Sequence, residues 1–250
     1  MEKFKPSENY ESKLSENQEL NNDKMSRRQF LKTLGTIGAG IVINSTIPES
    51  LFAQELKEYE EIWADIKESV EKLKANFNLQ QNEFAIIIDP SKQKLYLIKG
   101  EEILKSYSVS TGKAGIGSEY GSRKTPIGTH RIKEKFGDGA KPGTIFKARG
   151  NTGQVADIHT DKIDIKEDYV TTRIMWLNGQ ENKINKGGNV DSHNRYIYIH
   201  GTPEEGLIGE PASHGCIRMK NNDVIELFDF VPLGTLIEIQ NKEFIKKEKK

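Results

Sequence analysis

Residues 196–219 of the chain read YIYIHGTPEEGLIGEPASHGCIRM and contain its only cysteine, Cys216, together with two of its five histidines. Aromatic and β-branched residues at 196–199 predict a short strand that delivers His200 at its end. A loop of Gly, Pro and Glu follows, and Ser213–Cys216 opens the next element. Cysteine is a useful nucleophile only as its thiolate, so it needs a base or a cation nearby. We therefore expect His200 and Cys216 to meet in space, in the arrangement that nucleophilic acyl transfer requires.

This motif resembles the signature of the L,D-transpeptidases with a YkuD-type catalytic domain, bacterial enzymes that cross-link or trim peptidoglycan. Two other blocks resemble parts of the same family: VSTGKAGIGSEYGSRKTPIGTHRI at 109–132, and DVIELFDFVPLGTLIEI at 223–239 as the closing helix and strand of the domain. The resemblance covers residues 83–240. It implies a mainly β fold, a YkuD-like β-sandwich or barrel with a short helix after the nucleophile.

The resemblance also implies catalytic roles. Cys216 would attack a peptide carbonyl and form a thioester. His200 would accept the thiol proton or hold a thiolate–imidazolium pair, and the carbonyl of Gly201 would orient its ring. The N–H groups of Gly215 and Cys216 would form the oxyanion hole.

Three side chains around the nucleophile would support it, namely Ser213 and Arg218 in substrate binding and His214 in catalysis. Arg218 stands where many family members carry Asn, and its guanidinium could clamp a stem-peptide carboxylate bidentately. The alternatives are a structural ion pair for Arg218 and a structural role for His214.

A metal site is chemically possible with the ligands His193, His200, His214 and Cys216. Their spacing matches no zinc template, and a free thiolate already explains the set. We therefore expect neither a metal nor a cofactor.

The implied substrate is the tetrapeptide stem of peptidoglycan, cut between the L-centre of diaminopimelate and the terminal D-Ala. The acyl group would pass to an amine of a neighbouring stem or to water, and the motif leaves both transpeptidase and carboxypeptidase outcomes open. Two non-enzymatic alternatives are a peptidoglycan-binding module and an adaptor that docks through the helix predicted at 55–78. The intact cysteine and histidine argue against the module, because binding alone needs no thiol.

The N-terminal part of the chain differs from the rest. Residues 1–24 are polar and predict disorder. Residues 25–53 contain Ser26–Lys32, SRRQFLK, which resembles a twin-arginine export signal, and an uncharged run at 34–47 that is short for a membrane span. With a cleavage site at Leu51–Ala53, the protein would be exported to the periplasm or cell envelope. A basic pair before a buried helix and an uncleaved membrane anchor are the alternatives.

An amphipathic helix is predicted within residues 54–80, because apolar residues recur at spacings of three and four from Glu55 to Asn78. They are Leu56, Tyr59, Trp63, Ile66, Val70, Leu73 and Phe77. We expect this helix to pack on the catalytic domain, and dimerisation through a short coiled coil is the alternative.

From residue 83 onward the pattern is one of short β segments. Strands are predicted at 84–88, 95–98, 103–110, 130–134, 145–148, 171–177 and 235–239, and a helix at 221–230 with Asn221 or Asn222 as its cap. The irregular stretch 137–194 is expected to supply a lid or a wall of the substrate site. Residues 241–250 form a basic tail.

The composition excludes some partners. Lys plus Arg and Asp plus Glu both number 37, so no overall basic field would attract nucleic acid. The glycine-rich run at 112–122 lacks the GK[ST] ending of a phosphate-binding loop, which argues against nucleotide binding. The partners expected are therefore peptidoglycan stem peptides.

Overall fold

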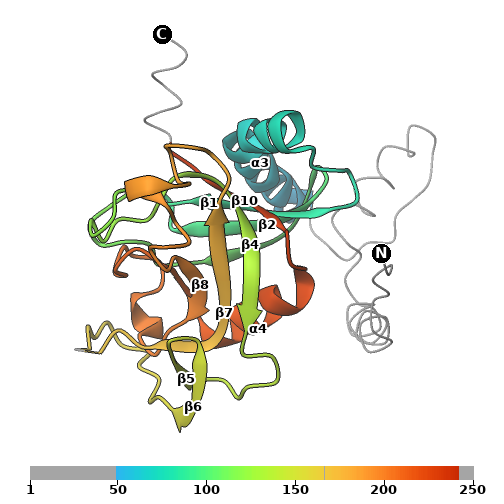
Figure 1. Ribbon diagram of the computed structural model, residues 1–250. Coiled ribbons are helices and arrows are strands. Elements are labelled where there is room, and N and C mark those ends of the chain that lie inside the picture. The colour runs from blue at the N-terminus through green and yellow to red at the C-terminus, as the bar shows by residue number, and fades with distance from the viewer. Residues whose placement is uncertain (1–48, 166, 242–250) are drawn as a thin grey trace, which may run out of the picture. The chain divides into compact units, whose positions relative to one another are not determined.

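The computed structural model describes residues 49–165 and 167–241 (Figure 1). The chain divides after Glu55 into two compact units, and the fold below is that of the second. The predictions of a disordered N-terminal segment, a twin-arginine motif and a basic tail lie outside the described residues, apart from Asn241 at the start of that tail.

Ten strands form one sheet, so the described chain is mainly β, as predicted. Eight of them follow the order β3-β2-β1-β10-β4-β7-β5-β6, and β8 pairs with β7 and β9. The strands are β1 (Phe84–Asp89), β2 (Lys94–Lys99), β3 (Glu102–Ser108), β4 (Gly128–Phe136), β5 (Thr144–Lys147), β6 (Gly150–Val155), β7 (Val170–Gly179), β8 (Tyr198–Gly201), β9 (Ile217–Met219) and β10 (Leu236–Ile239). Two pairs are parallel, β1 with β10 and β8 with β9, and the other pairs are antiparallel.

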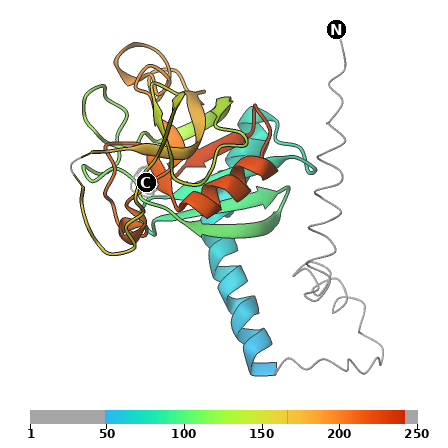
Figure 2. The ribbon, with the colours of Figure 1, turned by 90° about the horizontal axis from the view of Figure 1, so that it is seen from below.

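Strand β1 is apolar throughout because both of its faces are covered. Ala85 and Ile87 pack in one hydrophobic cluster with side chains of helix α3 (Glu49–Phe77), while Ile86 and Ile88 pack in another with helix α4 (Asn221–Phe230). A strand covered on both sides reads as a continuous apolar run rather than as an alternating one. The two helices therefore lie on opposite faces of this part of the sheet (Figure 2).

The cluster around α4 also joins the two ends of the sheet. It contains side chains from β1 and β2 together with Met175 and Leu177 of β7, Ile199 of β8 and Ile217 of β9. The sheet is therefore folded over a shared core, which fixes the strands that carry the motif on a rigid base.

Helix α3 confirms the predicted amphipathic helix but begins at Glu49, earlier than the predicted start at Glu55. Its buried side chains, Ile66, Val70 and Leu73, lie on the apolar face identified in the sequence. Within the described part of the chain, no helix is long and apolar enough to cross a membrane.

Helix α4 spans the predicted residues, but its N-terminus differs from the prediction. Neither Asn221 nor Asn222 is the cap residue, since Lys220 occupies that position without a side-chain cap. Instead, Glu205 from the preceding loop accepts the N–H of Asn221 at 2.8 Å. A carboxylate at this place is favourable because a helix N-terminus carries partial positive charge.

Two strands were not predicted, and one begins later than expected. All six residues of β6 are exposed, and β9 has only three residues. Strand β8 begins at Tyr198 rather than Tyr196, because Tyr196 adopts a left-handed conformation with φ 56° that a strand does not accommodate.

Candidate active site

The parallel pair of β8 and β9 brings the predicted nucleophile and base to the same place. The register aligns His200 with Arg218, and Cys216 immediately precedes β9. The backbone N–H of Tyr198 points at Cys216 Sγ, with an N···S distance of 3.4 Å. Tyr198 and His200 are two residues apart on one strand, so their side chains share a face. Strand pairing thus brings the two halves of the motif side by side.

The thiol of Cys216 is half-buried in largely apolar surroundings. It packs against a cluster that includes Phe146, Trp176 and Tyr198, and its Sγ donates to the carbonyl of Tyr196 at 3.4 Å. Burial raises the pKa of Cys216 to about 12, although the N–H of Tyr198 acts in the opposite direction. The resting nucleophile is therefore a neutral thiol.

His200 is held by the carbonyl that was predicted to orient it. Its Nδ1 lies 2.7 Å from the oxygen of Gly201, so Nδ1 carries the proton and Nε2 is left with its lone pair. The side chain is 1% exposed, and burial lowers its pKa to about 4. Together with the neutral thiol, this favours proton transfer from Cys216 to a neutral imidazole over a preformed thiolate–imidazolium pair.

Gly201 has no room for a side chain. A Cβ at this position would come within 2.6 Å of Asn221 Oδ1 and 2.9 Å of the carbonyl oxygen of Thr171. Asn221 accepts hydrogen bonds from the hydroxyls of Thr171 and Thr172 and donates to the carbonyl of Thr202. This buried network fixes the backbone that aims the His200 ring.

Ser213 shapes the turn that presents the nucleophile. Its hydroxyl donates to the carbonyl of Cys216 at 2.6 Å and accepts the N–H of Gly215 at 3.1 Å. Gly215 has φ 118°, and a Cβ there would lie 3.0 Å from the carbonyl oxygen of Lys124. Ser213 is buried and acts on the turn, and the Gly215 N–H predicted for the oxyanion hole is directed at Ser213.

Arg218 is 3% exposed, and both of its terminal nitrogens bind carboxylates of the protein. Nη1 donates to Glu204 at 2.6 Å and Nη2 donates to Asp168 at 2.5 Å. This geometry favours the structural ion pair over the predicted clamp for a substrate carboxylate.

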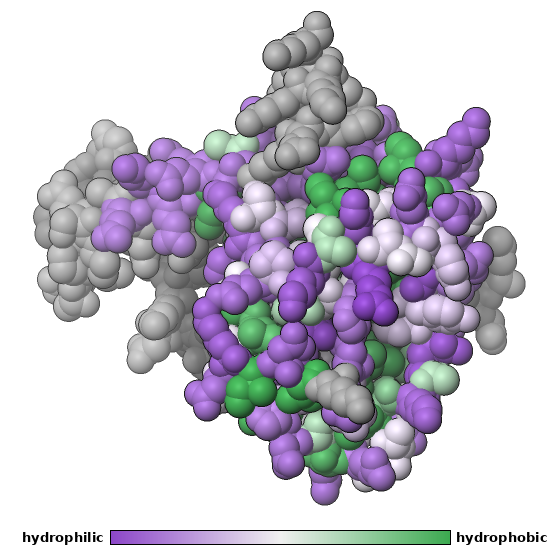
Figure 3. Space-filling view, turned by 90° about the vertical axis from the view of Figure 1, so that its left-hand side faces the viewer, coloured by the Kyte–Doolittle hydropathy of each residue, from purple (hydrophilic) through white to green (hydrophobic). Residues whose placement is uncertain are grey.

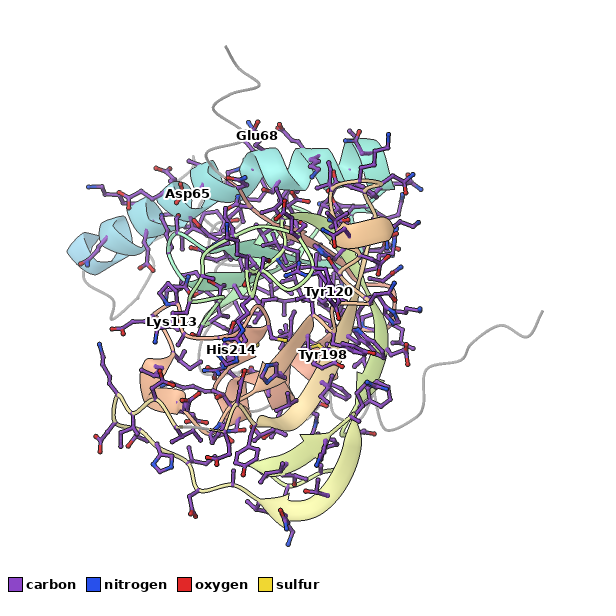
Figure 4. All side chains as sticks on the ribbon, turned by 60° about the vertical axis from the view of Figure 1, so that its left-hand side comes forward. Asp65, Glu68, Lys113, Tyr120, Tyr198 and His214 are labelled. Atoms are coloured by element: carbon purple, nitrogen blue, oxygen red, sulfur yellow. The ribbon has the colours of Figure 1, made fainter. Side chains whose placement is uncertain are left out.

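Asp168 connects this ion pair to the exposed face of the site. Its second oxygen lies 2.8 Å from Nδ1 of His214, whose side chain is 58% exposed. Burial alone would raise the pKa of Asp168, but its interactions with the Arg218 guanidinium and with the rings of His200 and His214 together hold it below its ordinary value. An ionised Asp168 therefore orients His214 and leaves Nε2 of that ring facing outward. Figure 4 labels His214 in the middle of the view, between Lys113 and Tyr198.

Sequence analysis did not single out Asp168, which is one acidic residue among several in a polar loop. Part of the stretch 137–194 was expected to form a lid or a wall, and the structure holds residues 156–165 of it beside the motif. The N–H of His159 donates to the carbonyl of Pro203 at 2.7 Å, and the N–H of Ile165 donates to Glu204 at 2.8 Å. The segment thereby carries Asp168 to the site.

An aromatic platform, consisting of Trp176, His193, Tyr196 and Tyr198, lies next to the thiol. Trp176 stacks on His193 with ring centroids 3.9 Å apart and on Tyr196 at 5.6 Å, and it meets Tyr198 edge-on at 5.6 Å. Tyr196 is more than half exposed. Sequence analysis assigned the platform no role, although its two tyrosines lie inside the motif.

Within residues 49–165 and 167–241, no three His, Cys, Asp or Glu side chains are arranged as ligands of a metal ion. The polar groups at the site instead bind one another, as described for His200, Arg218 and Asp168. The arrangement is suited to covalent chemistry at sulfur with a histidine base.

Comparisons with known proteins agree with this geometry. The YkuD family, described as the L,D-transpeptidase catalytic domain, matches residues 83–239. Putative L,D-transpeptidase YqjB of Bacillus subtilis is 48% identical over 52 residues, which are 20% of this chain and 30% of that protein. Putative L,D-transpeptidase YkuD of the same organism is 56% identical over 41 residues, 16% of this chain and 25% of its own. The chain thus spans between a quarter and a third of the length of these relatives.

Among solved structures, an L,D-transpeptidase from Mycobacterium smegmatis is similar with a TM-score of 0.39 and 20% sequence identity. The match covers 64% of this chain and 59% of that one.

Proposed function

Since the chain belongs to the YkuD family of L,D-transpeptidase catalytic domains, we propose that it is a cysteine-dependent acyltransferase that acts on tetrapeptide stems of peptidoglycan. The observation that carries the proposal is the pairing of β8 with β9, which sets Cys216 beside a strand whose His200 is neutral and oriented by Gly201. A binding module needs neither a thiol nor an oriented base.

The first half-reaction begins with proton transfer. The thiol of Cys216 gives its proton to Nε2 of His200, and Sγ attacks the carbonyl carbon of the diaminopimelate residue. The oxyanion that forms needs a donor. Since the N–H of Gly215 is directed at Ser213, we assign this role to the N–H of Cys216.

Collapse of this intermediate breaks the C–N bond. The protonated His200 gives its proton to the leaving nitrogen of D-Ala, which leaves as the free amino acid and generates a thioester on Cys216. An acceptor amine then attacks the thioester, the C–S bond breaks, and the proton lost by the amine returns to the sulfur through His200. Water in place of the amine gives the tripeptide.

The test is mass spectrometry of the purified protein incubated with a disaccharide-tetrapeptide, beside a Cys216→Ala control. We expect the wild type to release D-Ala and to form a cross-linked dimer, and the Cys216→Ala protein to form neither. Tripeptide without dimer would show a carboxypeptidase under those conditions. A wild type that behaves like the alanine control would contradict the enzyme and leave the binding module.

We also propose export by the twin-arginine route to the periplasm or cell envelope, where peptidoglycan lies. The support is the Ser26–Lys32 sequence and the uncharged run that follows it. Replacing Arg27 and Arg28 by lysine should retain the protein in the cytoplasm of a bacterial host, as measured by fractionation and immunoblot. Normal export of that variant would argue against this route.

A further inference from the structure

A substrate of the proposed class carries carboxylates, and the cation expected to bind one is not free to do so. Arg218 is buried and uses both terminal nitrogens on Glu204 and Asp168. Arg195, another cation whose charge acts on Cys216, directs its guanidinium at the main-chain carbonyls of Lys124 and Gly117. A substrate carboxylate therefore needs a different cation near the thiol.

Arg149 lies at the tip of the β5–β6 hairpin, in a conformation that its sequence does not favour. The two-residue loop consists of Ala148 and Arg149, with φ values of 47° and 69°. Hairpin turns with two positive φ values prefer Asn and Gly, because a Cβ is strained there. Such strain persists where the surrounding structure holds it, and it is concentrated at functional sites.

The contacts of Arg149 show what holds it in this conformation. Its guanidinium carbon lies 4.5 Å from the ring centroid of Trp176 and 5.8 Å from that of Tyr196, and Nη1 donates to the hydroxyl of Tyr198 at 3.5 Å. The hairpin thus places a cation on the aromatic platform. In Figure 4, Tyr198 lies between the β5–β6 hairpin and the loop that carries Tyr120.

The same platform holds the nucleophile. The carbonyl of Tyr196 accepts the hydrogen bond from Cys216 Sγ, and the N–H of Tyr198 donates a hydrogen bond to the same sulfur. The rings of Trp176 and Tyr196 hold the Arg149 guanidinium by cation–π contact. A guanidinium can bind a carboxylate through a pair of parallel N–H groups. Among the described residues, the long bond to Tyr198 is the hydrogen bond that this guanidinium makes.

We propose that Arg149 binds one of two carboxylates of the donor stem peptide, that of the terminal D-Ala or the free one of diaminopimelate, so that the hairpin tip and the aromatic platform form a carboxylate subsite beside Cys216. The inference rests on the proposed function for the identity of the ligand. It transfers to Arg149 the role that the sequence had suggested for Arg218.

Binding is measured in a Cys216→Ala background, where no turnover interferes, by calorimetry with three synthetic tetrapeptide stems. One stem has all carboxylates free, one ends in D-alaninamide, and one carries diaminopimelate amide. Arg149→Gln is the test variant. The matched control is Lys147→Gln, which removes a positive charge from an exposed position on the same hairpin without touching the platform.

We expect Arg149→Gln to weaken binding of the free stem by about tenfold or more, and Lys147→Gln to leave it nearly unchanged. One of the two amidated stems lacks the carboxylate that Arg149 binds. Its affinity for the Cys216→Ala protein should be as low as the affinity of the free stem for the Arg149→Gln variant. Arg149→Gln should not lower the affinity of this amidated stem any further. That stem identifies the carboxylate. Arg149→Lys, which keeps the charge, should retain part of the discrimination between free and amidated stems.

Equal losses on all three stems, or no loss on any of them, would overturn the carboxylate subsite. If Lys147→Gln also abolishes the difference in affinity between free and amidated stems, the effect of Arg149 is one of general charge. This result too would overturn the carboxylate subsite. Turnover of the same stems by the cysteine-containing protein is measured separately. If the protein distinguishes free from amidated stems but does not turn them over, the result contradicts the acyltransferase and supports the subsite. If it turns the stems over without distinguishing them, the result supports the acyltransferase and contradicts the subsite.

Discussion

At the scale of single residues, the protonation states of Cys216 and His200 decide how the chemistry starts. Burial raises the pKa of the thiol and lowers that of the imidazole, so both are neutral at pH 7. A neutral pair avoids the cost of two buried charges, which desolvation makes large. The proton therefore moves only when a substrate carbonyl is in place to accept the sulfur.

This state predicts the pH dependence of thiol alkylation. Because the pKa of Cys216 is about 12, its thiolate fraction and the rate of reaction with iodoacetamide should rise about tenfold per pH unit from pH 7 to 10, without a plateau. The chain contains a single cysteine, so intact-mass spectrometry reports on this site alone. A fast rate that is already constant from about pH 5 would indicate a thiolate–imidazolium pair instead.

The bridge made by Asp168 gives a second prediction. Asp168→Asn removes the charge that holds Nη2 of Arg218 and Nδ1 of His214. Loss of a hydrogen bond to a buried charge should lower the free energy of unfolding by about 1.5–3 kcal/mol, and a misplaced His214 should slow acylation of Cys216 about tenfold or more. Urea denaturation and the time course of acyl-enzyme mass measure the two effects.

The control for this variant lies four residues earlier. Asp164→Asn breaks the exposed pair between Lys113 and Asp164, so stability should change by less than about 0.5 kcal/mol and acylation should remain at the wild-type rate. If Asp168→Asn and Asp164→Asn have the same stability and the same acylation rate, Asp168 acts only as a surface charge and does not position His214.

Sequence reasoning could identify the residues of the site that stand in one contiguous motif. Pairing of β8 with β9 brings the two halves of the motif, with Cys216, His200 and Gly201, side by side, and the catalytic roles of these residues stay a prediction. The pairing of Arg218 with Asp168 could not be foreseen, since Asp168 is 50 residues away and reaches the site only through the course of the polar loop. The same holds for Arg149, whose position on Trp176 depends on the placement of a hairpin.

At the scale of elements, the strands that were predicted share a feature that β6 lacks. Strands β1, β2 and β7 are buried along most of their length, so their apolar runs are visible in the sequence. Strand β6 reads GNTGQV and is exposed at every residue, so nothing in its composition marks a strand. It forms through pairing with β5, which itself pairs with β7.

The strained turn between β5 and β6 predicts a stabilising substitution. Ala148→Asn places a residue that tolerates positive φ at the first turn position, and should raise the free energy of unfolding by about 0.5–1 kcal/mol. Thermal denaturation followed by circular dichroism measures the change. Lys147→Asn, one residue earlier and within β5, should give no gain. Equal stabilisation by both would show that the turn conformation is not the cause.

At the scale of the whole molecule, the sheet separates a structural side from a chemical side. Helix α3 covers one face of β1, β2 and β10, where Lys72 binds Glu181 and Glu238 at 3.1 and 2.8 Å. The motif lies at the other end of the sheet, with β8 and β9. On the face drawn in Figure 3, polar side chains predominate, and apolar ones form small separate patches at the upper right and in the lower half.

Two buried neutral histidines, one in each part of the sheet, make global stability depend on pH. His200 is held by Gly201, and His130 in β4 is bound through Nδ1 to the carbonyl of Gly128 and through Nε2 to the hydroxyl of Ser192, both at 2.9 Å. Burial lowers the pKa of each imidazole to about 4. In the unfolded chain both would protonate near pH 6.5.

Because the folded pKa is the lower one, the unfolded state binds more protons between these values, so stability is fully present above about pH 6.5 and is lost as the pH falls toward 4. Each histidine should account for about 3 kcal/mol over this window. Urea denaturation midpoints, determined at steps of half a pH unit, measure how the free energy of unfolding depends on pH. Most carboxylates titrate at the lower end of this pH window. His130→Gln, which can still donate to Gly128 and accept from Ser192, should halve the slope between pH 6.5 and 5. A slope that is unchanged by this substitution would show that His130 does not need to remain neutral for the fold to form, and a flat profile in the parent protein would show this for both imidazoles.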